Sequence, residues 1–226
     1  MRAKMRTVLL LTFFLAGCSN GPQPSSGQAY YKALNCRVCH KIGEEGAGRG
    51  GPDLTLIGFR RTPAWLDRWL KDPQAWKSDS LMPNPHLNDK AREALVEYLS
   101  GLKGQAWGDK HPWSDVADPV EKGHLIFAKA GCIACHGRGG VGGYPNNNVA
   151  GGKIPALANV SQTYTKEELK RKIAKGVYPQ KADPKGEDPL VRMPMWSEVL
   201  SQDEISAVAE YLFTLKPSAG AAGADW

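Results

Sequence analysis

The sequence predicts an all-α fold built from two small bundles of helices in tandem. Three observations predict it. A pentad of the form Cys-x-x-Cys-His occurs at residues 36–40 and again at residues 132–136. A Met-Pro pair follows each pentad, and a segment with apolar residues at helical spacing follows each pair. Because the same order recurs in both halves of a 226-residue chain, two small domains are expected.

The pentads predict covalent attachment of haem. The two cysteines of a pentad lie one helical turn apart, so their thiols can add to two vinyl groups along one porphyrin edge, and the histidine then faces the iron. These residues are Cys36, Cys39 and His40 in the first pentad, and Cys132, Cys135 and His136 in the second. A single pentad could belong to a zinc or redox site. Two copies use four of the five cysteines, which favours two covalently attached haem c groups.

The repeat extends beyond the pentads. A glycine and an aromatic residue precede each pentad at the same spacing, Gly27 with Tyr31 and Gly123 with Phe127. Glu-Tyr-Leu follows each Met-Pro pair and lies within the last helical segment of each half. In these features the chain resembles a two-domain dihaem cytochrome c, with two class I cytochrome c domains in tandem. The resemblance to cytochromes c, in which the last helix crosses the first where a glycine meets an aromatic residue, implies that Tyr98 packs against Gly27 and Tyr31.

The resemblance gives the domain organisation. Residues 27–103 would form the first cytochrome c domain and residues 119–216 the second, each a small bundle of helices around one covalently attached haem. A linker at residues 104–118 would join them, and Trp107 and Trp113 indicate that this linker packs against the domains. Its His111, like His124 of the second domain, is expected at the surface.

The resemblance also implies the ligands of each iron. His40 and His136 would be the proximal ligands, and the methionines of the two Met-Pro pairs, Met82 and Met193, would bind opposite them. Pro52 and Pro155 match the proline whose carbonyl accepts a hydrogen bond from the second ring nitrogen of the proximal histidine. That contact would fix the tautomer and the ring orientation.

Two alternatives to the methionines stay open. Met195 competes with Met193, because the sequence there is Met-Pro-Met-Trp and only one thioether can bind the iron. His86 lies close enough to Met82 in sequence to replace it as the sixth ligand of the first haem.

Helix signals mark the remaining elements. Thr62-Pro63 opens a short helix that Asp72-Pro73 closes, and Asn88 caps a helix that runs to about residue 102. Capping boxes open the two later helices, one from Thr165 to a stop at Gly176 and one from Ser201 to about residue 215. Residues 217–226 form a tail of mostly small residues.

The N-terminus predicts a membrane anchor. Residues 1–17 have the basic start and short apolar core of a signal peptide, and they end in Leu-Ala-Gly before Cys18, which resembles a bacterial lipobox. Cys18 would then carry the lipid, and residues 18–26 would form a flexible tether. The chain would be held on the extracytoplasmic, periplasmic side of a membrane. Ser19 slightly favours the outer membrane, and an ordinary secretory signal is the alternative.

The resemblance implies an electron-transfer protein with redox partner proteins, and charge adds little to this. The formal net charge is +6, three of which come from the signal peptide, so a nucleic-acid partner is not indicated. Five basic residues of the helix after Thr165 could meet an acidic partner or form a solvated face: Lys166, Lys170, Arg171, Lys172 and Lys175. With both irons closed by histidine and methionine, no catalytic residue is expected. The alternative is a haem-bearing subunit or a catalytic dihaem oxidoreductase of the dehydrogenase or peroxidase type.

Overall fold

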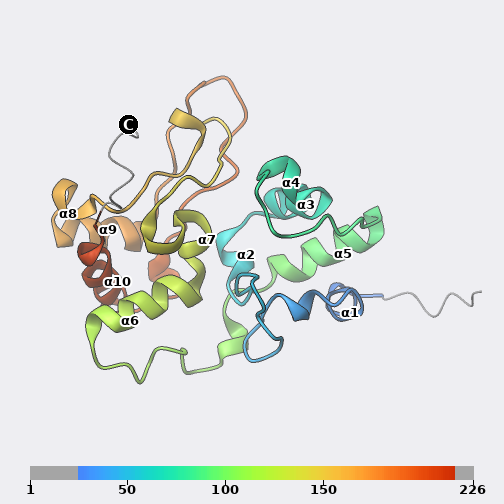
Figure 1. The fold of residues 1–226 in the computed structure, drawn as a ribbon, viewed down its shortest axis with the longest axis horizontal. Helices are drawn as coiled ribbons and strands as arrows, with labels where there is room; N and C mark the ends of the chain where they lie inside the picture. Colours follow the sequence, from blue (N-terminus) through green and yellow to red (C-terminus); the bar gives the residue numbers. More distant parts are fainter. Residues whose placement is uncertain (1–24, 217–226) are drawn as a thin grey trace, which may run out of the picture.

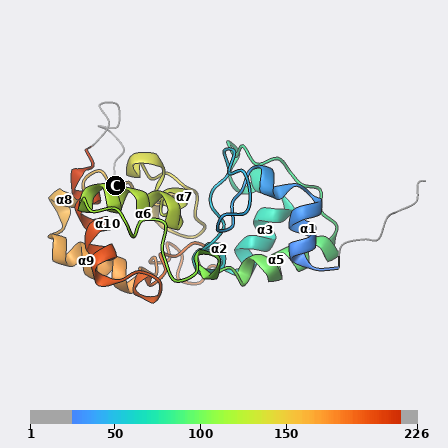
Figure 2. The ribbon, with the colours of Figure 1, turned by 90° about the horizontal axis from the view of Figure 1, so that it is seen from below.

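A computed structural model describes residues 25–216, which form two helical lobes side by side (Figures 1 and 2). Between residues 25 and 216 the regular elements are helices and helical turns; four isolated β-bridges occur there, but no strand. The predicted all-α fold is therefore confirmed. The predicted signal peptide, Cys18 with most of the tether, and the tail lie outside the described residues.

The first lobe consists of five helices. They are α1 (Gly27–Ala33), α2 (Ile57–Arg60), α3 (Pro63–Lys71), α4 (Pro73–Trp76) and α5 (Asp89–Ser100). Side chains cap four of them: those of Ser26, Thr62, Asp72 and Asn88 accept hydrogen bonds from the free N–H groups of the first turn. Helices α3 and α5 both lie against the centre of the lobe, and α1 crosses α5 (Figure 1).

The second lobe repeats this plan. Its helices are α6 (Pro119–Ile126), α7 (Ile133–His136), α8 (Val160–Thr163), α9 (Lys166–Lys175) and α10 (Gln202–Thr214). Both predicted capping boxes are formed, at the starts of α9 and α10. Shorter helical turns complete the chain: η1 (Cys36–Val38), η2 (Gln105–Trp107), η3 (Phe127–Gly131, a π-turn), η4 (Arg138–Gly140), η5 (Ala150–Gly152) and η6 (Trp196–Glu198).

The first and last helices of each lobe cross at a glycine. A Cβ atom on Gly27 would lie 2.0 Å from the carbonyl oxygen of Ala94, and one on Gly123 would lie 1.9 Å from that of Ala207. Only glycine therefore permits this approach of α1 to α5 and of α6 to α10. The ring of Tyr31 lies 6.2 Å from that of Tyr98 beside the first crossing, which confirms the expected core packing.

Two helix boundaries differ from those predicted. Asp72-Pro73 ends α3 as expected but also begins α4, because the Asp72 carboxylate accepts hydrogen bonds from the next two free N–H groups, those of Gln74 and Ala75. Helix α5 ends at Ser100, two residues before the predicted end.

The linker is packed rather than loose. Trp113 is fully buried, and its ring centroid lies 5.1 Å from that of Trp107 in an edge-to-face contact. The indole nitrogen of Trp113 and Nδ1 of His111 both contact Oε1 of Glu204, at 2.5 and 2.7 Å. His111, which was expected at the surface, is half-buried, because this carboxylate at the start of α10 holds it.

Each lobe contributes to the core of the other. Leu56, which precedes α2, is buried in the apolar cluster of the second lobe, and Val191 is buried in that of the first. Helix α2 lies between the lobes in both views (Figures 1 and 2). The two lobes therefore share apolar core residues across their boundary.

Candidate haem-attachment sites

The first pentad is held as a single helical turn. Asn35, the residue before it, has a left-handed backbone with φ of 57°, and the N–H groups of Cys39 and His40 then bond to the carbonyl of Cys36 at 3.2 and 3.0 Å. This turn brings the two thiols to the same side of the backbone and ends on the histidine.

The second pentad has the same geometry. Gly131 takes the place of Asn35 with φ of 91°, and the N–H groups of Cys135 and His136 bond to the carbonyl of Cys132 at 3.1 and 3.0 Å. Asparagine and glycine are the residues that adopt this conformation most readily, so their presence before each pentad is a signal that the sequence carries. The four cysteines of the two pentads are free thiols, as thioether formation requires.

His40 is oriented through its second ring nitrogen. Its Nδ1 lies 2.9 Å from the carbonyl oxygen of Pro52, so Nε2 is the nitrogen left to bind a metal. Burial lowers the pKa of His40, while the Pro52 carbonyl opposes that shift. A neutral imidazole is the form that a metal ligand requires.

His136 is placed in the same way with a looser contact. Its Nδ1 is buried and makes no contact that meets hydrogen-bond geometry. Burial lowers the pKa of His136 to about 4, and the contact with the carbonyl of Pro155 opposes this shift. The contact predicted for Pro52 is thus a hydrogen bond in the structure, whereas the carbonyl of Pro155 lies near His136 without meeting hydrogen-bond geometry.

The two methionines of the Met-Pro pairs lie against the cores of their lobes. Met82 packs on the first cluster, and its sulfur accepts a hydrogen bond of 3.0 Å from the indole nitrogen of Trp69. Met193 packs on the second cluster, and its backbone pairs with Val177. Met195, the alternative to Met193, lies outside the core and is 50 % exposed.

His86, the other alternative, is exposed and has a left-handed backbone with φ of 47°. A side chain in that position is solvated, as expected for a lone loop histidine. The assignment of the axial ligands stays a prediction, which the packing of Met82 and Met193 favours.

Several side chains beside these sites carry no sequence motif. Buried N–H groups without a hydrogen-bond partner include Nη1 of Arg61 and the indole nitrogens of Trp65 and Trp76. Unpaired buried donors are costly, so these three suit a bound group that brings acceptor oxygens. The carboxylates of a haem are such acceptors, and the donor set of the chain therefore fits this cofactor.

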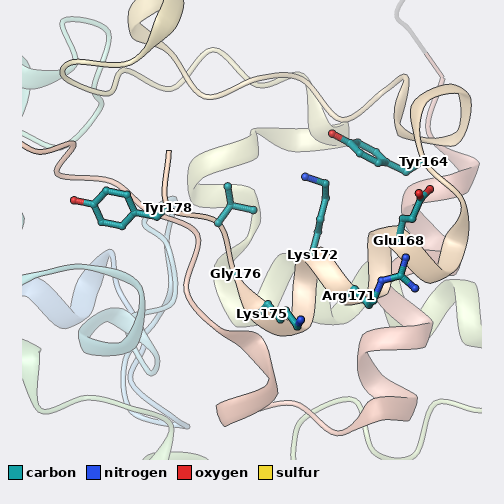
Figure 3. Close-up of a pocket in the computed structure, with 8 residues that line it drawn as sticks. Tyr164, Glu168, Arg171, Lys172, Lys175, Gly176 and Tyr178 are labelled. Carbon is teal, nitrogen blue, oxygen red and sulfur yellow. The ribbon is translucent and has the colours of Figure 1, made fainter. Parts of the chain in front are cut away.

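The basic helix α9 borders an open pocket of about 510 Å³ (Figure 3). Lys166 and Lys170 form ion pairs with Glu210 and Glu167, at 2.7 and 3.1 Å. Three residues of the predicted basic face are exposed and form no ion pair with another described residue: Arg171, Lys172 and Lys175. The side chains of Tyr164 and Tyr178 flank them in Figure 3.

A helical lobe that presents two free cysteines one turn apart, followed by a histidine held through its second ring nitrogen, has the arrangement of a c-type cytochrome. The model of the family "Cytochrome c" matches residues 25–103 and 120–216, and the chain belongs to this family. Membership implies covalently bound haem c and electron transfer through haem.

Three relatives show partial similarity. Cytochrome c6 of Euglena gracilis is 32 % identical over 39 % of this chain and 84 % of its own length. Cytochrome c oxidase subunit 2 is 32 % identical in Alkalihalophilus pseudofirmus, over 35 % of this chain, and 33 % identical in Bacillus subtilis, also over 35 %. The chain spans only 25 % and 26 % of the length of these two subunits.

A solved chain from the reducing HAO-like protein complex of Kuenenia stuttgartiensis aligns with 84 % of this chain and 96 % of its own. The TM-score of 0.30 and identity of 17 % are too low to carry an argument. In the part of the chain that the structure describes, no helix is both long and apolar enough to cross a membrane.

Proposed function

We propose that this chain is a dihaem electron carrier that passes single electrons between redox partner proteins on the extracytoplasmic side of a bacterial membrane. The observation that carries the proposal is the duplication of the whole site. Each lobe has its own left-handed residue, cysteine pair, histidine with a proline carbonyl beside it, and methionine against the core.

The residues of each lobe have separate tasks in this proposal. Cys36 and Cys39, or Cys132 and Cys135, would hold the haem, and the histidine of each pentad would bind its iron. Met82 or Met193 would be the second ligand of the iron, and a thioether in that role favours the ferrous state relative to a second imidazole. The haem supplies a reversible one-electron couple. With both axial positions filled, no site remains for a substrate.

The burial of the methionines supports this ligand set. In the second lobe Met193 packs on the core, while the side chain of Met195 is 50 % exposed and is not part of the core. In the first lobe Met82 packs on the core, while His86 is exposed.

Anchoring through Cys18 is part of the proposal and rests on the sequence. The lipid on Cys18 would hold the chain at the membrane, with the outer membrane slightly favoured, and the tether would end where Ser26 caps α1. About eight residues of flexible chain span roughly 15 Å on average, so the haem lobes would stay close to the membrane surface.

A second candidate function is that of a haem-bearing subunit with a fixed partner. It is favoured by the similarity to cytochrome c oxidase subunit 2 in two bacteria. The chain would then deliver electrons to one partner rather than diffuse between several. A catalytic dihaem oxidoreductase, of the dehydrogenase or peroxidase type, requires an iron with an open axial position.

The test is the haem content and the coordination of the full-length protein. A pyridine haemochrome assay is expected to give two haems per chain, and the double variants Cys36→Ala/Cys39→Ala and Cys132→Ala/Cys135→Ala are expected to keep one each. Cys18→Ser is the matched control, which should keep both haems and lose only the lipid. One haem in the wild-type chain would contradict the proposal.

Coordination is tested on the same material. Ferric haem with histidine and methionine ligands is expected to show a weak band at about 695 nm, which reports the thioether. The reduced protein is expected not to bind carbon monoxide, whereas Met193→Ala should bind it and Met195→Ala should not. Ready binding by the wild-type chain would favour the catalytic alternative.

A further inference from the structure

Two neighbouring arginines are buried between the lobes. Arg60 and Arg61 are each only 5 % exposed, and neither forms an ion pair with another described residue. Arg60 donates to two carbonyl oxygens, that of Asp53 at 2.8 Å and that of Gly131 in the other lobe at 3.2 Å. Burial, with the charge of Arg61 beside it, lowers the pKa of Arg60.

Arg61 is the less satisfied of the two. Its guanidinium lies between two rings, 4.4 Å from the centroid of Trp65 in its own lobe and 5.1 Å from that of Tyr144 in the second lobe. Its Nη1 has no hydrogen-bond partner. The charge of Asp53 acts on Arg60, but from beyond ion-pair distance. Two adjacent buried cations without an ion pair are unfavourable, so the site favours an added anion.

Further buried donors lie beside Arg61. The indole nitrogens of Trp65, which Arg61 contacts, and of Trp76 are buried and have no partner that meets hydrogen-bond geometry. The half-buried Tyr144 brings a hydroxyl group; burial raises its pKa to about 12, although Arg61 and Trp76 are near enough to oppose the shift. A neutral hydroxyl, two indole N–H groups and a guanidinium form a site that is suited to a carboxylate.

The position of the cluster indicates which carboxylate it takes. Arg60 reaches the carbonyl of Gly131, the residue directly before Cys132, so the thioether edge of the second-lobe haem would lie here. In haem c the thioether bonds and the two propionates leave from opposite edges of the porphyrin, so that haem would point its propionates away. Cys135 and Tyr144 of the second lobe pack on the same core cluster as Trp65, Cys36 and Met82. Since the thioether edge of the second-lobe haem would lie at this cluster, the first-lobe haem is the one left to supply a propionate here.

We propose that Arg61 of the first lobe and Tyr144 of the second bind the same propionate of the first-lobe haem. The second lobe thereby completes the cofactor site of the first. This inference rests on the two-haem function proposed above, and it adds an assignment that follows from no motif. It also makes the contact between the lobes depend on the cofactor, because the carboxylate supplies the counter-charge that the interface lacks.

The decisive experiment is a redox titration of the full-length protein with both haems, comparing wild type with Tyr144→Phe. Loss of the hydroxyl donor leaves the propionate charge less neutralised, which favours ferric iron. The potential of the first-lobe haem is therefore expected to fall although the substitution is in the second lobe, and the potential of the other haem should stay unchanged. Arg61→Gln should lower the same potential further.

Controls separate this effect from general ones. Tyr178→Phe changes an exposed tyrosine of the second lobe, and Arg49→Gln removes an exposed arginine of the first; both should leave the two potentials near their wild-type values. The first-lobe haem is identified as the one whose potential falls most in Met82→His.

The outcomes distinguish the two proposals. A chain with two haems and no shift in Tyr144→Phe, or a shift confined to the second-lobe haem, would overturn this inference and leave the carrier function intact. A chain with one haem would overturn both. If Arg61→Gln does not fold, Tyr144→Phe decides alone, because it removes one oxygen from a half-buried ring.

Discussion

At the scale of single residues, the proposed ligand Met82 has a neighbour that would tune it. Its sulfur accepts a hydrogen bond from Trp69, whose ring stacks on that of Trp65 at a centroid distance of 5.1 Å. A thioether sulfur has two lone pairs, so it can accept this bond and still bind iron. The donor withdraws electron density from the sulfur, which makes the sulfur a weaker donor to ferric iron.

Trp69→Phe is therefore expected to lower the potential of the first-lobe haem while leaving that of the second unchanged. A redox titration followed optically measures both values. Trp107→Phe, a tryptophan of the linker, is the control and should move neither. If the potential of the first-lobe haem is the same in Trp69→Phe and wild type, the hydrogen bond does not persist in the haem-bound protein.

The residues of the site differ in how far the sequence predicts them. The cysteines and histidines follow from a fixed spacing, since covalent attachment forces both thiols and the imidazole into one turn. The methionines have no fixed distance from the histidines and follow only from the resemblance to cytochromes c. Trp69, Arg61 and Tyr144 obey no such spacing. Trp69 reaches Met82 only when α3 has packed in the first lobe, and Arg61 reaches Tyr144 only when the two lobes have packed together. These contacts therefore cannot be predicted from the local sequence.

At the scale of elements, the start of α10 joins the linker to the second lobe. Glu204 closes the capping box through Oε2, which accepts the N–H of Ser201 at 2.8 Å, while Oε1 contacts His111 and Trp113. Burial alone would raise the pKa of Glu204, but the hydrogen bonds from His111, Ser201 and Trp113 outweigh it and the pKa is lowered. The carboxylate thus serves both as a helix cap and as the anchor of the linker.

Glu204→Gln is expected to reduce the free energy of unfolding at pH 7 by about 1–2 kcal/mol, since it weakens a capping box and two further hydrogen bonds. Because the folded-state pKa lies below the unfolded value of about 4.3, this stabilisation is present above that pH and is lost as the pH falls through the folded pKa. The difference between wild type and variant should therefore shrink in acid. Urea unfolding at several pH values measures it.

Glu168→Gln provides the comparison, because it alters the other capping box, where the carboxylate is exposed and contacts only Thr165. Its effect on stability should be smaller. Equal losses in the two variants would mean that the contacts of Glu204 with the linker contribute nothing to stability.

Helix starts were predictable because capping is local chemistry. Asn88, Thr165 and Ser201 each begin a helix where the sequence predicts one. The position of His111 could not be predicted from the sequence, because it is fixed by the carboxylate of Glu204, which lies 93 residues away in the chain. Tryptophans in the linker indicated packing, but not the surface on which it occurs.

At the scale of the whole molecule, the two lobes share their cores and present one basic face on α9. Arg171, Lys172 and Lys175 are exposed there, beside the exposed apolar side chains of Val177 and Tyr178. Residues of this surface adjoin a second open pocket that includes Met193, the proposed ligand of the second-lobe haem. An electron partner seated on α9 would therefore approach that haem from its methionine side.

Positive charge on this face is expected to steer anionic partners toward the second lobe. Hexacyanoferrate(III), an anionic oxidant, should oxidise the reduced protein at a rate that falls as ionic strength rises, since charges farther apart than roughly 8 Å are screened at 0.15 M salt. The double variant Arg171→Glu/Lys172→Glu should slow the reaction at low salt and flatten its salt dependence. Stopped-flow absorbance gives both rates.

The matched control is the double variant Lys71→Glu/Lys90→Glu, which changes the net charge by four, as the α9 double variant does. Lys71 and Lys90 are exposed cations of the first lobe that form no ion pair with another described residue. If the first-lobe pair slows the reaction as much as the α9 pair, net charge alone governs the rate. A salt dependence that survives in the α9 variant would likewise show that α9 is a solvated helix face and not the point of approach.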